Sequence, residues 1–376
     1  MSHLSKNTGF DLRKYVGDMS QIAGMKSYQL LEGKSKGVRA VDFWTGTGLN
    51  FTVVLDRGMD ISRASYKGSS LCWRSCTGEI HPYSFESQGA GWLRGFFGGL
   101  LTTCGLTYLG APCIDQGEHL GLHGRISYIP AENIQMNQEW EGEDYVMSLS
   151  GQMRQSCVFG ENLVLKRKII AWLGRSEILL EDVVENDGFK ESPFMILYHI
   201  NIGFPLLSPG SKFVSPSVKI APRDSEAEED IEKFNEVEMP PLSGYREKVY
   251  YHEMKADENG MVRCAVLAEN ASEEPYGLYV IYNKNQLPRF VQWKMLGEQN
   301  YVLGIEPSNC WTEGRDKERE WGTLEFIKKG EKRKFTLRLG VLSNKIEVER
   351  FIKDVQKIVG EEQSHIVSKM DMLRKK

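Results

Sequence analysis

Two side chains in this sequence combine a type and a setting that suit proton transfer. His199 stands in the largely apolar run 198–205, and Glu306 stands between apolar neighbours in residues 303–307. Burial raises the pKa of a carboxyl group, and histidine titrates near neutral pH, so both types can serve as a general acid or base. We therefore predict that His199 and Glu306 are candidate acid–base residues.

The setting of His199 also has an explanation that needs no catalysis. Asn201 lies two residues further along the same predicted strand, so both side chains point to one face of it. A buried polar pair must be hydrogen-bonded or face a binding cleft, because unpaired burial costs free energy. The sequence leaves both explanations open.

A third polar segment, residues 118–123, places His119 and His123 four residues apart. On a helix this spacing would put both imidazoles on one face, where they could bind a metal ion together with Glu118. Gly121 disfavours a helix, however, and the glutamate that follows the first histidine of zinc proteases is absent. We therefore expect no metal, with His119 at the surface and His123 in a core as the simpler interpretation.

Nucleotide-binding motifs are incomplete in this sequence. Residues 45–51 begin like the glycine-rich dinucleotide fingerprint, but Phe51 stands where the third glycine should be, and strand-like residues follow. The sequence also has no glycine-rich loop that ends in Gly-Lys-Ser or Gly-Lys-Thr. We therefore expect no cofactor.

The elements that must position these residues are short strands separated by turns. Glycine accounts for 37 of the 376 residues, or about 10%, which is above the average of roughly 7%. Residues rich in β-branched and aromatic side chains predict strands at 49–55, 145–150, 163–172, 177–185, 194–201, 277–282, 290–294 and 334–340. Turn sequences at 185–188, 257–260 and 328–331 separate them. The pattern predicts an all-β protein.

Clear helical periodicity appears only near the C-terminus, where apolar residues recur at steps of three, four and seven from Asn344 onward. This spacing predicts a helical segment over about 344–373. The acidic stretch 224–238 predicts a solvated excursion with a short helix and a loop. Strands continue on both sides of it, so we predict a single domain over 1–376, a large antiparallel β-sandwich with a C-terminal helix.

Composition and charge exclude several classes of protein. The hydrophobic fraction of 41% and the charged fraction of 26% are ordinary for a folded globular protein. A net charge of −4 argues against a nucleic-acid partner. The sequence contains no run of 18 apolar residues, so it predicts no membrane-spanning helix. The charged N-terminus shows no signal peptide, and the seven cysteines are odd in number and sparse. We therefore expect a cytoplasmic protein without a disulfide framework.

With these segments in view, the sequence resembles the aldose 1-epimerase (galactose mutarotase-like) superfamily, within it an uncharacterised sugar-epimerase-like branch. Five motifs carry the resemblance in family order and cover most of the chain. They are residues 55–61 (LDRGMDI), 98–106 (GGLLTTCGL), 122–125 (LHGR), His199 on its strand, and 304–307 (GIEP).

The resemblance implies a large antiparallel β-supersandwich whose concave face binds a monosaccharide. It also implies that His199 acts as the acid and Glu306 as the base, and that His123 of the Leu-His-Gly motif contacts the sugar. The imidazole of His199 and the carboxylate of Glu306 would then lie about one sugar-width apart, on the same sheet face as His123. Opening a cyclic hemiacetal needs one acid and one base, which agrees with these residue types.

The sequence departs from the family at two places. Where the family has a site arginine before an Ile or Leu, this chain has Cys104-Gly105-Leu106, and no residue matches the family aspartate that binds sugar hydroxyls. Three cations, Arg57, Arg125 and Lys294, are candidate substrate-binding residues that would suit a sugar bearing a carboxylate, phosphate or sulfonate. Pairing with structural acids explains the same cations equally well.

Three functions therefore stay open. The first is a sugar mutarotase or a related epimerase that interconverts the anomers of a monosaccharide. The second is a metal-assisted isomerase or lyase of a keto sugar that uses Glu118, His119 and His123 as ligands. The third is a non-catalytic carbohydrate-binding protein that keeps the fold as a scaffold. The sequence specifies neither the sugar nor the oligomeric state.

Overall fold

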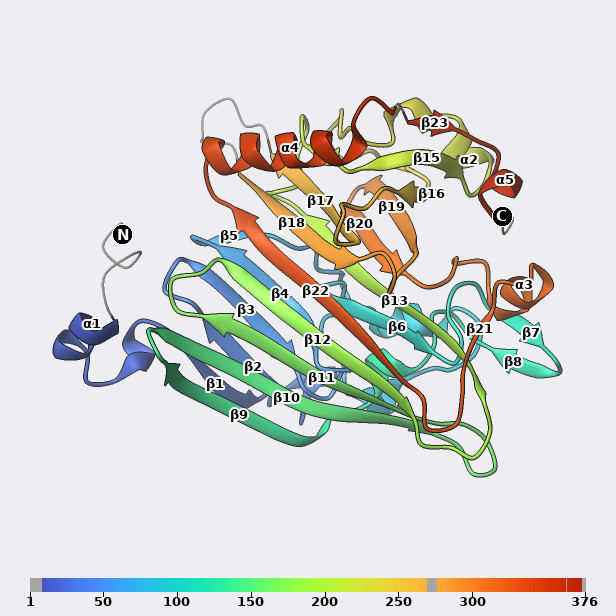
Figure 1. The fold of residues 1–376 in the computed structure, drawn as a ribbon. Coiled ribbons are helices and arrows are strands. Elements are labelled where there is room, and N and C mark those ends of the chain that lie inside the picture. Colours follow the sequence, from blue (N-terminus) through green and yellow to red (C-terminus); the bar gives the residue numbers. More distant parts are fainter. Residues whose placement is uncertain (1–8, 269–275, 363, 374–376) are drawn as a thin grey trace.

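The computed structural model describes residues 9–268, 276–362 and 364–373, and it consists mainly of antiparallel strands (Figure 1). A first sheet is formed by consecutive strands joined by short turns. Its five strands, in spatial order, are β1 (Gly24–Gln29), β2 (Arg39–Trp44), β3 (Leu49–Val54), β4 (Asp60–Tyr66) and β5 (Ser69–Ser70). Consecutive pairing of this kind follows from the Gly-containing turns between the strands.

A second sheet contains five strands of ten or more residues. Its order is β14 (Lys212–Val214), β17 (Met261–Ala268), β18 (Tyr276–Asn283), β22 (Lys332–Leu342), β12 (Glu177–Asn186), β11 (Asn162–Trp172), β10 (Asp144–Ser156) and β9 (Glu132–Glu141). Buried and more exposed residues alternate along most of β12 and β22, as expected for strands with one face on a core.

The third sheet carries the candidate site residues. Its order is β21 (Glu325–Ile327), β13 (Ser192–Gly203), β20 (Asn300–Ser308), β19 (Arg289–Gly297), β16 (Lys248–Met254), β15 (Ser217–Pro222) and β23 (His365–Ile366), and β6 (Thr102–Leu106) pairs with β13. Strands β13 and β20 are buried along nearly their whole length, which means that both faces of this sheet are covered.

One apolar core draws on all three sheets. It includes Phe51 of the first sheet, Leu180 of the second and Ile305 of the third, all less than 3% exposed. A second apolar cluster lies on the opposite face of the third sheet and includes Trp92, Phe96 and Leu197. The structure therefore has the predicted all-β architecture of large antiparallel sheets.

The helices lie at the periphery. They are α1 (Gly9–Tyr15), α2 (Ser225–Glu228), α3 (Arg315–Glu320), α4 (Lys345–Val359) and α5 (Lys369–Leu373), and a hairpin of β7 (Cys113–Asp115) and β8 (Glu118–Leu120) packs beside α3. Figure 1 shows α4 lying across one end of the molecule, where Val348, Phe351 and Val355 pack against β17 and β18. No helix within the described residues is both long and apolar enough to cross a membrane.

All eight strands predicted from the sequence are confirmed, and the acidic stretch contains the short helix α2. The predicted C-terminal helix is confirmed only as α4. It ends at Val359 because Gly360 adopts a φ of +67°, a left-handed conformation that terminates helices. The prediction was wrong beyond that point, since Ile366 lies in the short strand β23 and Met370 in the separate helix α5.

Candidate functional site

The register of two neighbouring strands brings His199 and Glu306 together. Strands β13 and β20 are antiparallel, and their register pairs Ile200 with Ile305 and Leu197 with Ser308. His199 therefore stands directly opposite Glu306 on the same sheet face. The Nε2 atom of His199 lies 3.2 Å from Oε1 of Glu306.

Both side chains are almost fully buried, with 5% of His199 and 2% of Glu306 exposed. The expectation of one shared face holds, but the expectation of a sugar-width between the two groups does not. The difference arises because directly opposed residues of adjacent antiparallel strands have Cβ atoms about 5 Å apart, which lets long side chains touch.

Aromatic rings enclose the imidazole of His199. Its ring centroid lies 5.2 Å from that of Phe96, 5.4 Å from Trp293 and 6.1 Å from His123, each in an edge-to-face arrangement. His123 itself packs at 4.8 Å against Trp92. The three predicted residues His123, His199 and Glu306 thus gather at one place, although they come from segments far apart in the sequence.

The Leu-His-Gly motif positions His123 through its backbone. His123 has a φ of +55° and Gly124 a φ of +79°, so the chain makes a left-handed turn here. A Cβ atom on Gly124 would lie 2.2 Å from the carbonyl oxygen of Gly105, which explains why only glycine fits. The N–H of His123 donates to the carbonyl of Gly110 at 3.1 Å. Close backbone packing therefore fixes where this imidazole points.

Several buried polar atoms at this site have no hydrogen-bond partner within the described residues. They are Nδ1 of His123, Nδ1 of His199, Oδ1 of Asn201 and Oε1 of Glu306. The geometry of the short His199–Glu306 contact does not make it a hydrogen bond. Because buried polar groups are normally satisfied, these four atoms are places where water or a bound ligand would supply the missing partners.

Burial shifts the proton affinities of these groups in opposite directions. Desolvation lowers the pKa of His199 to about 3 and that of His123 to about 4. The neighbouring His123 lowers the pKa of His199 further and the side chain of Asn201 opposes that shift, while the positive charge of Arg223 lowers the pKa of His123 further. Desolvation raises the pKa of Glu306 well above its usual value. At these pKa values the two imidazoles are neutral near pH 7, and burial favours the protonated form of Glu306.

Two charged residues that the sequence did not mark, Glu247 and Arg223, lie beside Trp293 at the site. The indole N–H of Trp293 donates to Oε2 of Glu247 at 2.8 Å, and Oε1 of Glu247 accepts from Arg223 at 3.0 Å. Both charges act on Glu306, whose pKa Glu247 raises and Arg223 lowers. Arg223 borders the acidic stretch and Glu247 precedes β16, so nothing in their local sequence marks them.

The structure gives Arg57 a different environment from the predicted sugar contact. Its guanidinium is fully buried and donates to three backbone carbonyls, those of Ser127 at 2.7 Å, Ile80 at 3.2 Å and Gly95 at 2.8 Å. It also stacks 3.9 Å from the ring of Tyr128. Arg57 therefore ties three loops together behind the site.

Lys294 lies on the wrong face of the sheet for the predicted role. It follows Trp293 on β19, so the two side chains point to opposite faces, and Trp293 is the one that meets His199. The Nζ atom of Lys294 donates to the carbonyl of Lys233 at 2.8 Å, and burial lowers its pKa to about 8. The structure does not bring Lys294 to the pair.

Arg125 is exposed, and its guanidinium lies 5.7 Å from the ring of Phe85, at the surface beside the turn of His123. The metal-site alternative is also not assembled. Residues 118–120 form strand β8 instead of a helix, Glu118 is bound by Arg315 at 2.5 Å, and His119 is exposed. Within the described residues, no three His, Cys, Asp or Glu side chains gather in a metal-binding arrangement.

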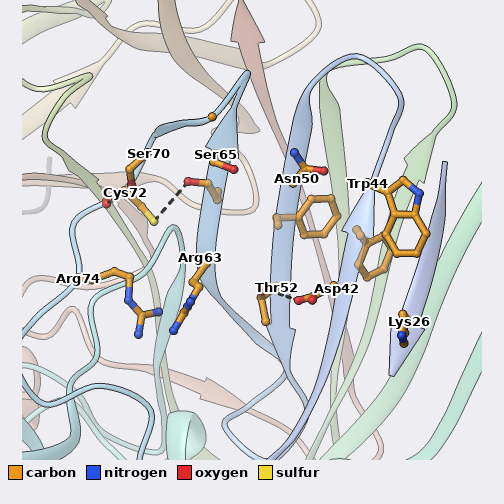
Figure 2. Close-up of a pocket in the computed structure, with 14 residues that line it drawn as sticks. Lys26, Asp42, Trp44, Asn50, Thr52, Arg63, Ser65, Ser70, Cys72 and Arg74 are labelled. Carbon is orange, nitrogen blue, oxygen red and sulfur yellow. Dashed lines mark hydrogen bonds between the residues drawn. The ribbon is translucent and has the colours of Figure 1, made fainter. Parts of the chain in front are cut away.

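A groove on the solvent-exposed face of the first sheet lies away from these residues (Figure 2). It has a volume of about 460 Å³, and Figure 2 shows Trp44, Thr52, Arg63 and Arg74 among its lining side chains. Three of its charged side chains have polar partners: Asp42 accepts from Thr52 at 2.6 Å, and Arg63 and Arg74 lie 3.6 and 2.7 Å from Glu79. We place the chemistry at His199 and Glu306, where polar atoms are unpaired.

Comparisons with known proteins identify the family and the fold of the chain. Residues 35–341 match the family model described as "Domain of unknown function (DUF4432)". A crystal structure of a "putative aldose 1-epimerase" from Klebsiella pneumoniae is similar with a TM-score of 0.87 and 24% identity, over 93% of each chain. A galactose mutarotase-like protein from Clostridium acetobutylicum (TM-score 0.59) and a galactose 1-epimerase from Lactobacillus acidophilus (TM-score 0.55) are each 13% identical, over 86% of this chain and 100% of theirs. None of the curated proteins matches in sequence.

Proposed function

The chain belongs to the DUF4432 family, and from this premise and its galactose mutarotase-like fold we propose that it is a sugar mutarotase or a closely related sugar epimerase. It would interconvert the anomers of a monosaccharide by acid–base ring opening. The observation that carries the proposal is the buried contact of 3.2 Å between His199 and Glu306, next to unpaired polar atoms.

Ring opening requires two coordinated proton transfers. One group takes the proton of the anomeric hydroxyl while another protonates the ring oxygen, and the bond between the anomeric carbon and the ring oxygen breaks to leave a carbonyl. Rotation about the adjacent carbon–carbon bond and reclosure then give the other anomer. Each positioned acid or base typically contributes about 10²–10⁴-fold to the rate.

The directions of the pKa shifts favour a starting proton on Glu306. With the proton on Glu306, its carboxyl group donates to the ring oxygen and the neutral imidazole of His199 accepts from the anomeric hydroxyl. This is the reverse of the roles that the resemblance implies. Reclosure returns both protons, so the pair needs only one proton between its two members and ends each turnover as it began.

Sugar binding must replace the direct contact of the pair. Two oxygens of the sugar, inserted between Nε2 of His199 and Oε1 of Glu306, would each meet one of these atoms, and Oε1 would gain a hydrogen-bond partner that it lacks within the described residues. Nδ1 of His123 and the carboxylate of Glu247 are further groups that can meet sugar hydroxyls. Satisfying buried polar atoms favours the bound state.

An NMR measurement of anomer exchange tests the proposal. Purified protein is added to each of a panel of monosaccharides, and the exchange rate between the two anomeric signals is compared with the uncatalysed rate. We expect acceleration for at least one sugar, unchanged by chelation of metal ions. Saturable binding of a sugar without acceleration would identify a carbohydrate-binding protein instead, and activity lost on metal removal would favour a metal-assisted isomerase.

A further inference from the structure

Arg223 has no direct contact with the His199–Glu306 pair, yet a chain of short contacts connects it to His199. Its Nη2 atom lies 3.0 Å from Oε1 of Glu247, whose other oxygen accepts the indole N–H of Trp293 at 2.8 Å. The ring of Trp293 stands edge-to-face on His199 at 5.4 Å and 77°. Arg223, Glu247 and Trp293 come from different segments and thus form a chain of contacts that leads to the imidazole of His199.

We propose that Arg223 is a positioning residue of the acid–base site, which holds Glu247 so that Trp293 keeps the His199 imidazole in its orientation toward Glu306. This role rests on the proposed function insofar as it concerns turnover. The contacts themselves are independent of any substrate.

Arg223 is well suited to fix the orientation of Glu247, because hydrogen bonds hold both the backbone and the side chain of Arg223. Its backbone N–H donates to the carbonyl of Val249 at 2.9 Å, and Val249 pairs directly with Trp293 across β16 and β19. Its side-chain Nε is held by Asp224 at 2.8 Å. The guanidinium is therefore fixed relative to the very strand that carries Trp293.

Glu247 depends on this anchor. Its side chain is 48% exposed and precedes β16, so without Arg223 its orientation would depend on the single hydrogen bond from the indole N–H of Trp293. Exposed ion pairs contribute only about 0–1 kcal/mol to stability. Loss of Arg223 should consequently change the orientation of Trp293 and His199 much more than it changes the stability of the fold.

The positive charge of Arg223 leads to a second, independent consequence that can be measured. Arg223 lowers the pKa of both His123 and Glu306. Removing its charge should raise both values, and a pH–rate profile governed by these groups would then move to higher pH.

The experiment compares Arg223→Gln with the neighbouring control Arg246→Gln. Arg246 is also an arginine paired with a glutamate, at 2.6 Å from Glu226, but its side chain is 73% exposed. The ¹⁵N-resolved indole signal of Trp293, assigned with Trp293→Phe, and the imidazole signals of His199, assigned with His199→Asn, are recorded for each variant. The indole signal of Trp293 and the imidazole signals of His199 should shift in Arg223→Gln and remain unchanged in Arg246→Gln. Glu247→Gln, which keeps an acceptor oxygen, should give a smaller shift.

On the best sugar found, Arg223→Gln should lower kcat about tenfold with KM changed less than about twofold, since a misplaced group affects the reacting geometry more than ground-state binding. Unmoved His199 signals in Arg223→Gln would overturn the positioning role, whether or not the protein acts on sugars. If the wild type accelerates no exchange but the signals move as expected, the proposed function fails and the contact chain stands.

Discussion

Strand β13 carries two neighbouring residues that enter buried polar clusters of opposite kinds. Tyr198 points to one face, where its hydroxyl donates to Oδ2 of Asp182 at 2.8 Å. His199 points to the other face, where it meets Glu306. Both clusters are almost inaccessible to water, so burial alone does not distinguish them.

The cluster on the Tyr198 face is fully satisfied. Arg167 binds both oxygens of Asp182 at 2.9 and 2.7 Å, and its Nη1 lies 2.8 Å from Asp60. Asp60 in turn accepts from the N–H and the hydroxyl of Thr103. Each charge has an opposite charge and hydrogen bonds, which is how an ionic cluster survives in a core.

The cluster on the His199 face is left incomplete, with unpaired atoms on His123, His199, Asn201 and Glu306. A folded protein tolerates such groups where a ligand completes them, at a cost in stability. Hydrogen-bond satisfaction, more than burial or charge, therefore distinguishes the structural cluster from the candidate site.

The largest expected effect comes from breaking the satisfied cluster. Replacing Arg167→Met should cost about 3–5 kcal/mol of unfolding free energy, because Asp60 and Asp182 would remain buried without their partner. Urea unfolding followed by circular dichroism measures the loss. Arg338→Met, at a 45% exposed arginine paired with Glu177, is the control and should change the free energy by less than about 0.5 kcal/mol. A stable Arg167→Met protein would contradict the structural role of this cluster.

Breaking the unsatisfied cluster should affect turnover instead of folding. His199→Asn and Glu306→Gln each remove a proton-transfer group while keeping much of its shape, so each should lower kcat by at least about 100-fold. The double variant should lose little more, since both groups serve one transfer. Anomer-exchange rates test this, and near wild-type rates in all three variants would show the assignment to be wrong.

A smaller effect concerns the dependence of the unfolding free energy on pH. The folded-state pKa of Glu306 lies above its usual value of 4.5, so its contribution to stability is fully present below about pH 4.5 and is lost as pH rises through the folded pKa. Glu306→Gln has no such loss and should be more stable than the wild type at pH 8, by about 0.5–2 kcal/mol. Urea midpoints of the two proteins at pH 5 and pH 8 give the answer; equal differences at both pH values would refute the raised pKa.

The smallest effect tests which face of the third sheet matters. Lys294 was expected from the sequence to bind substrate, but it projects away from Trp293 and His199. Lys294→Met should leave KM on the best sugar within about twofold of the wild type, because no contact with the sugar is removed. A KM increase of tenfold or more would return Lys294 to the binding site.

The local sequence determined the residue types of the site and much of the fold. Alternating and β-branched runs predicted strands such as β3, β11 and β12, because burial of one sheet face imposes that pattern. Edge strand β9 was missed, since its residues are mostly exposed and carry little apolar pattern. The apolar settings of His199 and Glu306 marked both residues before their contact was known.

Tertiary structure alone decided which of the marked residues meet. The register of β13 and β20 places His199 opposite Glu306, and the pairing of β19 with β20 turns Trp293 toward the pair and Lys294 away from it. In the folded chain, Arg57 donates to the carbonyls of Ile80, Gly95 and Ser127. Arg223 pairs with Glu247, although a long excursion of the chain separates the two residues in sequence. Residue type and strand period are local properties that the sequence carries directly. Strand register and the partners of a buried cation depend on contacts between distant segments, and only the folded chain establishes those.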